Sequence, residues 1–309
     1  MKTILFVGGL FFSLASFAQK GDELLVYSMK GTASVIEDKK ESKLKIGKVL
    51  KPGSVIKTQP QAKLTLVCKQ GKALSVTKAG TFPVTKWKDS CYSSSALTSV
   101  TTKYFRYIWD QLYVRSDDYK NQHNDNNVGA VERDDAPVRG DKLLEIEFVE
   151  GMDSINYAGG SFRLSWETSI PYTGRYNFLL IDKQNGKTVY EDSVTGKTQQ
   201  LDSLVKYMKA GRTYYWYLAT PSTGISQGGV IKYILLRRVN QQVGKLQKSV
   251  NVPEGQAAQY FRIAYLLEQT CYPADALRYY QKAVTAAPEE AIYQDKLSEF
   301  KKIFQLETR

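Results

Sequence analysis

Short runs of alternating apolar and polar residues, separated by glycine, fill the segment 22–92. In one of these runs Leu64, Leu66 and Cys68 fall on the same face. Alternation with a period of two is the pattern of a β-strand that buries one face. Many such strands with turn residues at short intervals are typical of a small sandwich or barrel. The pattern therefore predicts a compact all-β domain over 22–92.

A second series of runs with the same period occupies 143–240. Tyr214, Trp216 and Leu218 share one face of such a run, and we expect this face to meet Trp166 across a sandwich core. The predicted strands of this segment are 143–149, 161–166, 176–182, 187–190, 213–219 and 230–239. The pattern predicts a β-sandwich.

Two other segments repeat apolar residues every three or four positions, which is the spacing of an amphipathic helix. The run from Leu97 to Leu112 predicts a helix in the connector 93–142, whose remainder is polar and is expected to form a flexible linker. This helix would pack against one of the sheets or bind a partner. The second segment, 254–306, predicts a helical hairpin followed by a capping helix. The expected fold class is multidomain and mainly β, with α-helices at the C-terminal end.

The helical segment 254–306 also resembles a known repeat family. The spacing of its small and aromatic residues is similar to one tetratricopeptide unit, and the matching residues are Tyr260, Ala264, Leu267, Ala276, Tyr280, Ala283 and Pro288. A single unit cannot bury its own faces, because stability in such arrays comes from stacking on neighbours. We therefore predict that it docks on the sandwich or on another subunit, as a folding cap or as a recognition site.

Two further resemblances concern the β segments. The order VYSMKGTASV, LKIGKVLKPGSVIKTQPQAKLTLVCKQGKALSV and TKAGTFPV resembles a FecR-type domain, and it implies a periplasmic interaction module. The order FRLSWETS, YNFLLIDKQNGKTVYEDSV and AGRTYYWYLATP resembles a bacterial immunoglobulin-like or fibronectin type III domain without a cysteine pair. Such domains serve as spacers or binding modules.

Residues 1–18 have the three parts of a secretory signal peptide. Lys2 supplies the positive charge, an uncharged apolar run follows, and Ser16 and Ala18 are the small residues before a cleavage site. The run is shorter than the roughly 20 apolar residues that span a bilayer. We expect secretion across the inner membrane, a periplasmic or extracellular location, and no transmembrane segment in the mature chain.

The positive charge of the chain is concentrated in its first domain. The whole sequence carries a formal net charge of +12, and residues 20–88 alone contain 15 lysines, no arginine and five acids. Such a field favours an anionic glycan, a membrane surface or an acidic protein face as partner. The alternative is that these lysines discourage edge-to-edge pairing of the sheets. An exported protein has little access to nucleic acid, so none is expected as a partner.

The three cysteines allow one disulfide and one unpaired thiol. Cys68 and Cys91 are the candidate pair, because both lie in the first domain and an oxidising compartment permits their pairing. Two buried thiols are the alternative. We expect Cys271, in the helical segment, to be unpaired.

The sequence offers little chemistry for catalysis. It contains no G-x-S-x-G, H-E-x-x-H or phosphate-binding glycine loop, and the only histidine, His123, lacks metal-ligand spacing. We therefore expect no catalytic residue, no metal site and no cofactor. The modules predict a non-enzymatic interaction scaffold or adaptor in the bacterial periplasm, with an envelope protein as partner. The alternative is a glycan or cell-wall binding protein that uses the lysine-rich first domain.

Overall fold

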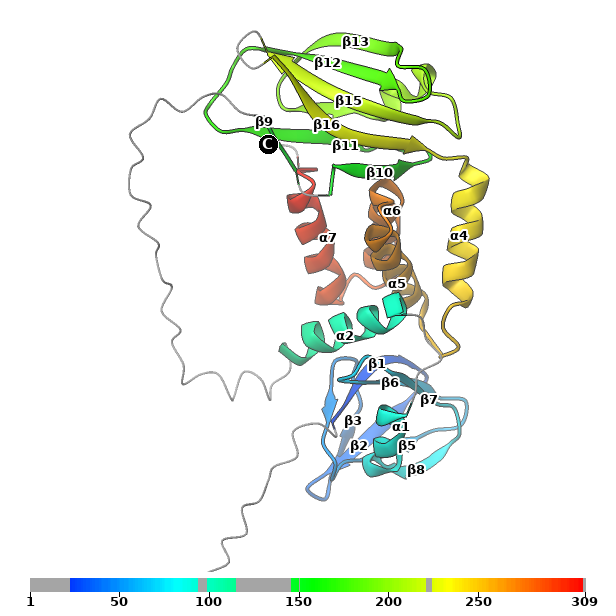
Figure 1. Cartoon of the computed structure of the whole chain (residues 1–309). Helices are drawn as coiled ribbons and strands as arrows, with labels where there is room; N and C mark the ends of the chain where they lie inside the picture. Colours follow the sequence, from blue (N-terminus) through cyan, green and yellow to red (C-terminus); the bar gives the residue numbers. More distant parts are fainter. Residues whose placement is uncertain (1–22, 94–98, 115–145, 150, 221–223, 308–309) are drawn as a thin grey trace, which may run out of the picture.

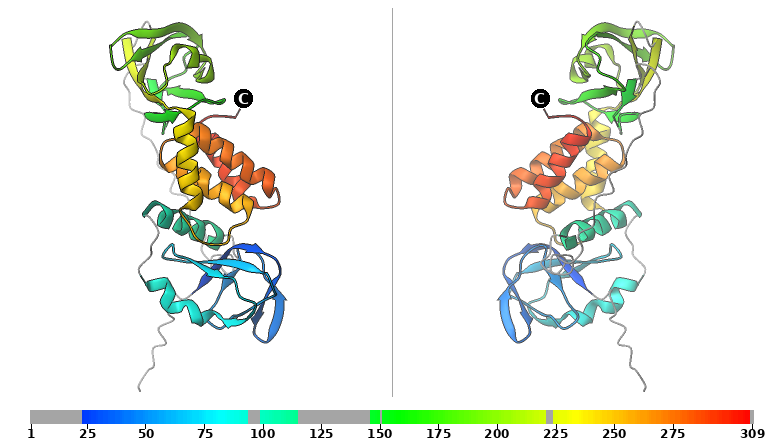
Figure 2. Two further views of the ribbon diagram at one scale, coloured as in Figure 1. Left: turned by 90° about the vertical axis from the view of Figure 1, so that its right-hand side faces the viewer. Right: turned by 90° about the vertical axis from the view of Figure 1, so that its left-hand side faces the viewer.

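The computed structural model describes residues 23–93, 99–114, 146–149, 151–220 and 224–307. Two β-rich domains lie at opposite ends of the molecule, and a layer of helices lies between them (Figure 1). The two side views show the same order of the three parts (Figure 2). The expectation of a multidomain, mainly β fold with C-terminal helices is thus confirmed. The predicted signal peptide 1–18 and residues 115–145, which include His123, lie outside the described residues.

The first β domain consists of two four-stranded sheets, in the orders β4-β1-β6-β7 and β3-β2-β5-β8. Its strands are β1 (Leu24–Lys30), β2 (Ala33–Glu37), β3 (Lys40–Lys43), β4 (Val49–Leu50), β5 (Val55–Thr58), β6 (Lys63–Cys68), β7 (Ala73–Val76) and β8 (Gly80–Pro83). Strand β1 is buried on both faces. Leu24 and Val26 belong to the core between the sheets, whereas Leu25 and Tyr27 belong to the core shared with the helices. The period of two therefore sends alternate side chains into two different cores.

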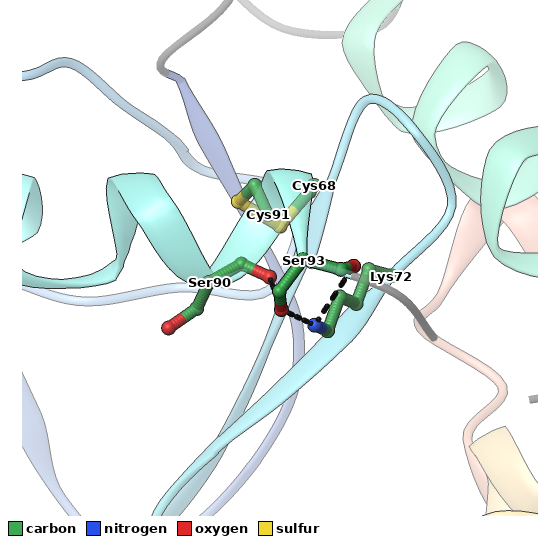
Figure 3. The surroundings of a disulfide bond; sticks show 5 residues. All are labelled: Cys68, Lys72, Ser90, Cys91 and Ser93. Atoms are coloured by element: carbon green, nitrogen blue, oxygen red, sulfur yellow. Dashed lines mark hydrogen bonds between the residues drawn. A yellow bond between two sulfur atoms is a disulfide. The ribbon is translucent and has the colours of Figure 1, made fainter. Parts of the chain in front are cut away.

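A disulfide closes the end of this domain. After a 3-10 turn (Val84–Trp87), the short helix α1 (Lys88–Tyr92) brings Cys91 to Cys68 at the end of β6, and the two sulfurs are bonded (Figure 3). Beside the bond, the Lys72 ammonium donates hydrogen bonds to the backbone oxygen and the hydroxyl of Ser93. Cys271 is exposed and forms no disulfide.

The second β domain consists of a five-stranded sheet, ordered β10-β16-β15-β12-β13, and a three-stranded sheet, ordered β14-β11-β9. Its strands are β9 (Ile146–Phe148), β10 (Ser154–Tyr157), β11 (Arg163–Thr168), β12 (Arg175–Asp182), β13 (Thr188–Thr195), β14 (Thr198–Gln200), β15 (Thr213–Thr220) and β16 (Gly224–Tyr233). Trp166 and Trp216 are fully buried with ring centroids 6.4 Å apart. The expected contact between these two residues is confirmed.

The prediction of a strand over 230–239 is wrong beyond Tyr233. Strand β16 ends there, and helix α4 (Leu236–Lys248) begins three residues later. Val239 and Val243, four positions apart, are the buried residues of this helix. The continuous apolar run that precedes them conceals the change of period from two to 3.6. Strands β10 and β14 were not predicted, since both are short.

The helical layer consists of α2 (Ser99–Val114), α4, α5 (Gln256–Gln269), α6 (Pro273–Ala286) and α7 (Ala291–Ile303). Helix α2 lies between the first β domain and α5, and α6 reaches β10 of the second β domain (Figure 1). The predicted amphipathic helix within the connector and the predicted C-terminal helices are therefore present. Buried residues from both β domains and from this layer form one continuous hydrophobic cluster.

We predict that replacing both Cys68 and Cys91 with serine lowers the free energy of unfolding by about 3 kcal/mol, because the bond closes a loop in the unfolded chain. The two residues are 23 positions apart in the sequence. The matched control is Cys271→Ser, which removes an exposed thiol and should change stability by less than about 0.5 kcal/mol. Urea unfolding of the oxidised proteins measures both effects. Equal losses in the two variants would contradict a stabilising role for the disulfide.

Candidate functional site at the junction of the first β domain

The side of the helical layer that faces the second β domain is fixed by hydrogen bonds to backbone atoms. The Arg163 guanidinium on β11 donates to the backbone oxygen of Gln305 through Nε at 3.0 Å and through Nη2. Asn156 on β10 donates its backbone N–H to the oxygen of Cys271 at 2.7 Å. Its side-chain amide donates to the oxygen of Thr270 at 3.0 Å. The helices are therefore attached to both sheets of this domain.

The other side of the layer contacts the first β domain through aromatic residues. Tyr27 on β1 and Tyr104 on α2 are buried, and their hydroxyl oxygens lie 2.8 Å apart. The Tyr27 hydroxyl also donates to Oε1 of Glu254 at 3.1 Å. Tyr107 on α2 stacks on Tyr265 of α5 with ring centroids 4.9 Å apart.

A buried ion pair lies next to these tyrosines. The Arg262 side chain on α5 is 0% exposed and that of Glu254 is 5% exposed. Arg262 donates to Oε1 through Nε and to Oε2 through Nη2, each at 2.8 Å. Its Nη1 donates to the backbone oxygen of Leu246 at 2.7 Å and to the hydroxyl of Ser249 at 3.1 Å. This guanidinium thus joins the end of α4, the linker before α5, and α5 itself.

The surroundings of the junction keep the Arg262 guanidinium charged. Burial alone would lower the pKa of Arg262, but the hydrogen bonds and the charge of Glu254 raise it above its ordinary value. Burial, reinforced by the charge of Glu254, raises the pKa of Tyr27 and of Tyr104 well above the usual range. Both phenols are consequently neutral hydrogen-bond donors at physiological pH.

The sheet β4-β1-β6-β7 turns one face toward this junction, and along its strands that face changes from apolar residues to hydroxyl residues. Leu25, Val67 and Ala73 pair in register across β1, β6 and β7, and they belong to the shared core with α2. A second row, which we call the hydroxyl row, follows on the same strands and consists of Ser28, Thr65 and Ser75. The Thr65 hydroxyl donates to the backbone oxygen of Pro253, and Ser28 Oγ accepts the Gly255 N–H at 2.9 Å. The linker before α5 is thus hydrogen-bonded onto two hydroxyls of the sheet.

A basic cleft lies at the open end of this face. It has a volume of about 540 Å³ and lies between the sheet and the linker residues 251–254. Lys30 and Lys63, which pair directly across β1 and β6, line it together with Thr77 and Ser75 of the hydroxyl row. Within the described part of the chain, no acidic side chain forms an ion pair with either lysine.

The residues that match the tetratricopeptide spacing occupy the interior of the helical layer and do not line the basic cleft. The buried members of this set are Ala264, Leu267, Ala276, Tyr280 and Ala283. Tyr260 is half-buried against Tyr279, and Pro288 is exposed after α6. The small alanines allow α5 and α6 to approach closely. Tyr280 donates its hydroxyl to Glu268 of α5 at 2.5 Å, which ties the two helices together.

Sequence reasoning did not identify the residues of the junction or of the cleft. Glu254 and Arg262 stand at the start of a predicted helical segment, and nothing in their spacing distinguishes them from surface charges. Lys30 and Lys63 were visible only as two of many lysines. Their direct pairing depends on the strand register, which a β-bulge between Val26 and Ser28 shifts by one residue.

Among the described residues, no cluster of three or more histidine, cysteine, aspartate or glutamate side chains could hold a metal ion. The helices of the described ranges are all too short or too polar to cross a membrane. The connector also contains two pairs of adjacent aspartates, at 117–118 and 134–135, and both lie outside the described residues.

Comparisons with known proteins add little to this picture. No family model matches the chain, and no curated protein matches it. One solved structure, described as "Structural insight into host cell surface retention of a 1.5-MDa bacterial ice-binding adhesin", is similar over 67% of this chain at 12% identity. The chain spans about half of that structure, 54% of its length, with a TM-score of 0.15. A likeness at this level carries no argument about fold or function.

We predict that Arg262→Met lowers the free energy of unfolding by about 3–5 kcal/mol, since it leaves the Glu254 carboxylate buried without its partner. The double variant Arg262→Met/Glu254→Leu should recover most of this loss, because no unpaired charge remains. The control is Lys197→Met, which breaks the half-exposed pair with Glu167 and should cost less than about 1 kcal/mol. Urea unfolding midpoints measure all three. A loss for Arg262→Met no larger than that of the control would contradict the assigned role of the pair.

Proposed function

We propose that the protein is a non-enzymatic scaffold or adaptor that is exported and acts in the periplasm of a bacterium. The observation that carries this proposal is the attachment of one helical layer to both β domains, through Arg262 and Glu254 at one side and Arg163 at the other. Such a connection keeps the two domains at a fixed separation. A protein that holds two partners at defined positions needs this property.

The resemblances of the three parts support the same proposal. FecR-type, immunoglobulin-like and tetratricopeptide modules are all interaction modules, and we assign them to the first β domain, the second β domain and the segment α5–α7. The signal peptide proposed for residues 1–18 would bring the mature chain into the periplasm or outside the cell. In that compartment the Cys68–Cys91 bond can form and persist.

The exposed strands at the two ends of the molecule are the surfaces that we propose for partners. Strand β3 is an edge of its sheet and is exposed over its whole length. Strand β13 is the edge of the five-stranded sheet and is largely exposed over eight residues. An edge strand presents unpaired backbone groups to which another chain can add. A scaffold of this kind would engage one partner at each end.

Site-specific photocrosslinking in the intact envelope tests this function. A photoreactive amino acid is placed at Ser42 on β3, at Ser193 on β13, or at Gln241 on α4, all of which are exposed. We expect discrete protein adducts from Ser42 and from Ser193, identified by mass spectrometry, and markedly fewer from the control position Gln241.

The proposal also predicts that the two end positions capture different proteins, which then purify together with a chain carrying both crosslinkers. Absence of adducts at both ends, or equal adducts at all three positions, would contradict a scaffold. Wild-type chain without a crosslinker supplies the background.

A further inference from the structure

The pairing of Lys30 with Lys63 is a feature that the fold itself does not need. Side chains directly opposite in an antiparallel pair lie about 4.5–5.5 Å apart at Cβ, and like charges there destabilise the sheet. Both lysines are exposed, and neither has an ion-pair partner among the described residues. Two adjacent unneutralised ammonium groups create a local field that an anion would relieve.

The cleft around this lysine pair supplies hydrogen-bonding groups as well as charge. Ser28 and Ser75 of the hydroxyl row, Thr77 directly after β7 and Asn251 of the linker line it beside the lysines. The carboxylate of Glu254 also belongs to the lining, but both of its oxygens accept hydrogen bonds from Arg262. The cleft therefore presents a net positive charge with four uncharged polar side chains next to it.

The lining also restricts the kind of ligand. Val252 and Pro253 are the non-polar residues of the cleft, and none of its residues is aromatic. A ligand there is held by charge and hydrogen bonds and not by stacking. The volume of about 540 Å³ lies within the range of small-molecule sites, roughly 300–1,000 Å³. A flat bilayer surface cannot enter a recess between a sheet and a loop, and an acidic peptide would lack pockets for apolar anchors.

We propose that the basic cleft binds an acidic oligosaccharide, of which one or two carboxylated sugar units occupy the cleft. Lys30 and Lys63 pair with the carboxylates, while Ser75, Thr77 and Asn251 bond to the sugar hydroxyls. This site lies on the opposite sheet of the first β domain from β3, so it goes beyond the proposed scaffold function and uses different residues.

Isothermal titration calorimetry of the full chain with trigalacturonate, at low ionic strength, tests the site. We expect binding to the wild type, and none to the neutral trisaccharide maltotriose. The variant Lys30→Gln/Lys63→Gln should bind at least about tenfold more weakly, since it loses two charge-assisted contacts. The matched control Lys40→Gln/Lys43→Gln removes the same charge from exposed β3 and should change the affinity by less than about twofold.

Charge reversal separates a binding defect from misfolding. Lys63→Glu replaces a like-charge pair with an ion pair across β1 and β6, so its thermal midpoint should equal or exceed that of the wild type. The same variant should no longer bind trigalacturonate. A folded Lys63→Glu protein that binds as well as the wild type would overturn the proposal.

Competing ligands complete the test. Equal losses in the two double glutamine variants would show a diffuse charge effect and would overturn the site. Tighter binding of a hexaglutamate peptide than of trigalacturonate would overturn it in favour of an acidic protein partner. Binding to phosphatidylglycerol vesicles without binding to trigalacturonate would overturn it in favour of lipid. None of these outcomes bears on the photocrosslinks at Ser42 and Ser193, so the two proposals fail independently.

Discussion

The arrangement of the three parts depends on the buried contact between Arg262 and Glu254. A buried ion pair gains little net stability, because the desolvation of two charges offsets their attraction. The pair instead fixes the position of the linker relative to α5. If either segment moved, Arg262 and Glu254 would lose each other as partners inside the protein. The guanidinium also bonds to the end of α4, and the carboxylate accepts the Tyr27 hydroxyl of the first β domain. One contact therefore determines where four segments of the chain meet.

The same contact shapes the surface to which we assign ligand binding. Linker residues 251–254 form one wall of the basic cleft, and Glu254 ends that wall. Hydrogen bonds from Thr65 and to Ser28 hold the linker on the sheet from the other direction. A ligand in the cleft would consequently contact both the first β domain and the linker before α5. Occupation of the cleft would then stabilise the junction, by the general linkage between binding and stability.

Much of the local structure could be predicted from the sequence, because it depends on neighbours along the chain. The alternation of Leu64, Leu66 and Cys68 indicated a strand with a buried face, and that face lies in the core of the first β domain. The spacing from Leu97 to Leu112 indicated a helix, and α2 begins at Ser99. Helix α4 was not predicted, because only two of its residues, Val239 and Val243, are buried. Two apolar positions directly after a strand give too weak a helical period to recognise.

The junction and the cleft could not be predicted, because they depend on contacts between distant parts of the sequence. Tyr27 meets Glu254 across 227 positions, and Thr65 meets Pro253 across 188. The pairing of Lys30 with Lys63 required the register of β1 and β6. Only the excess of lysine in the first domain was visible beforehand, and it indicated an anionic partner without indicating a place for it.

The central claim is that the helical layer joins both β domains into one cooperative body, and differential scanning calorimetry tests it most directly. The account predicts a single unfolding transition of the oxidised chain, with calorimetric and van 't Hoff enthalpies that agree. Two or more separate transitions, or a calorimetric enthalpy well above the van 't Hoff value, would show that the domains unfold independently and would contradict the account.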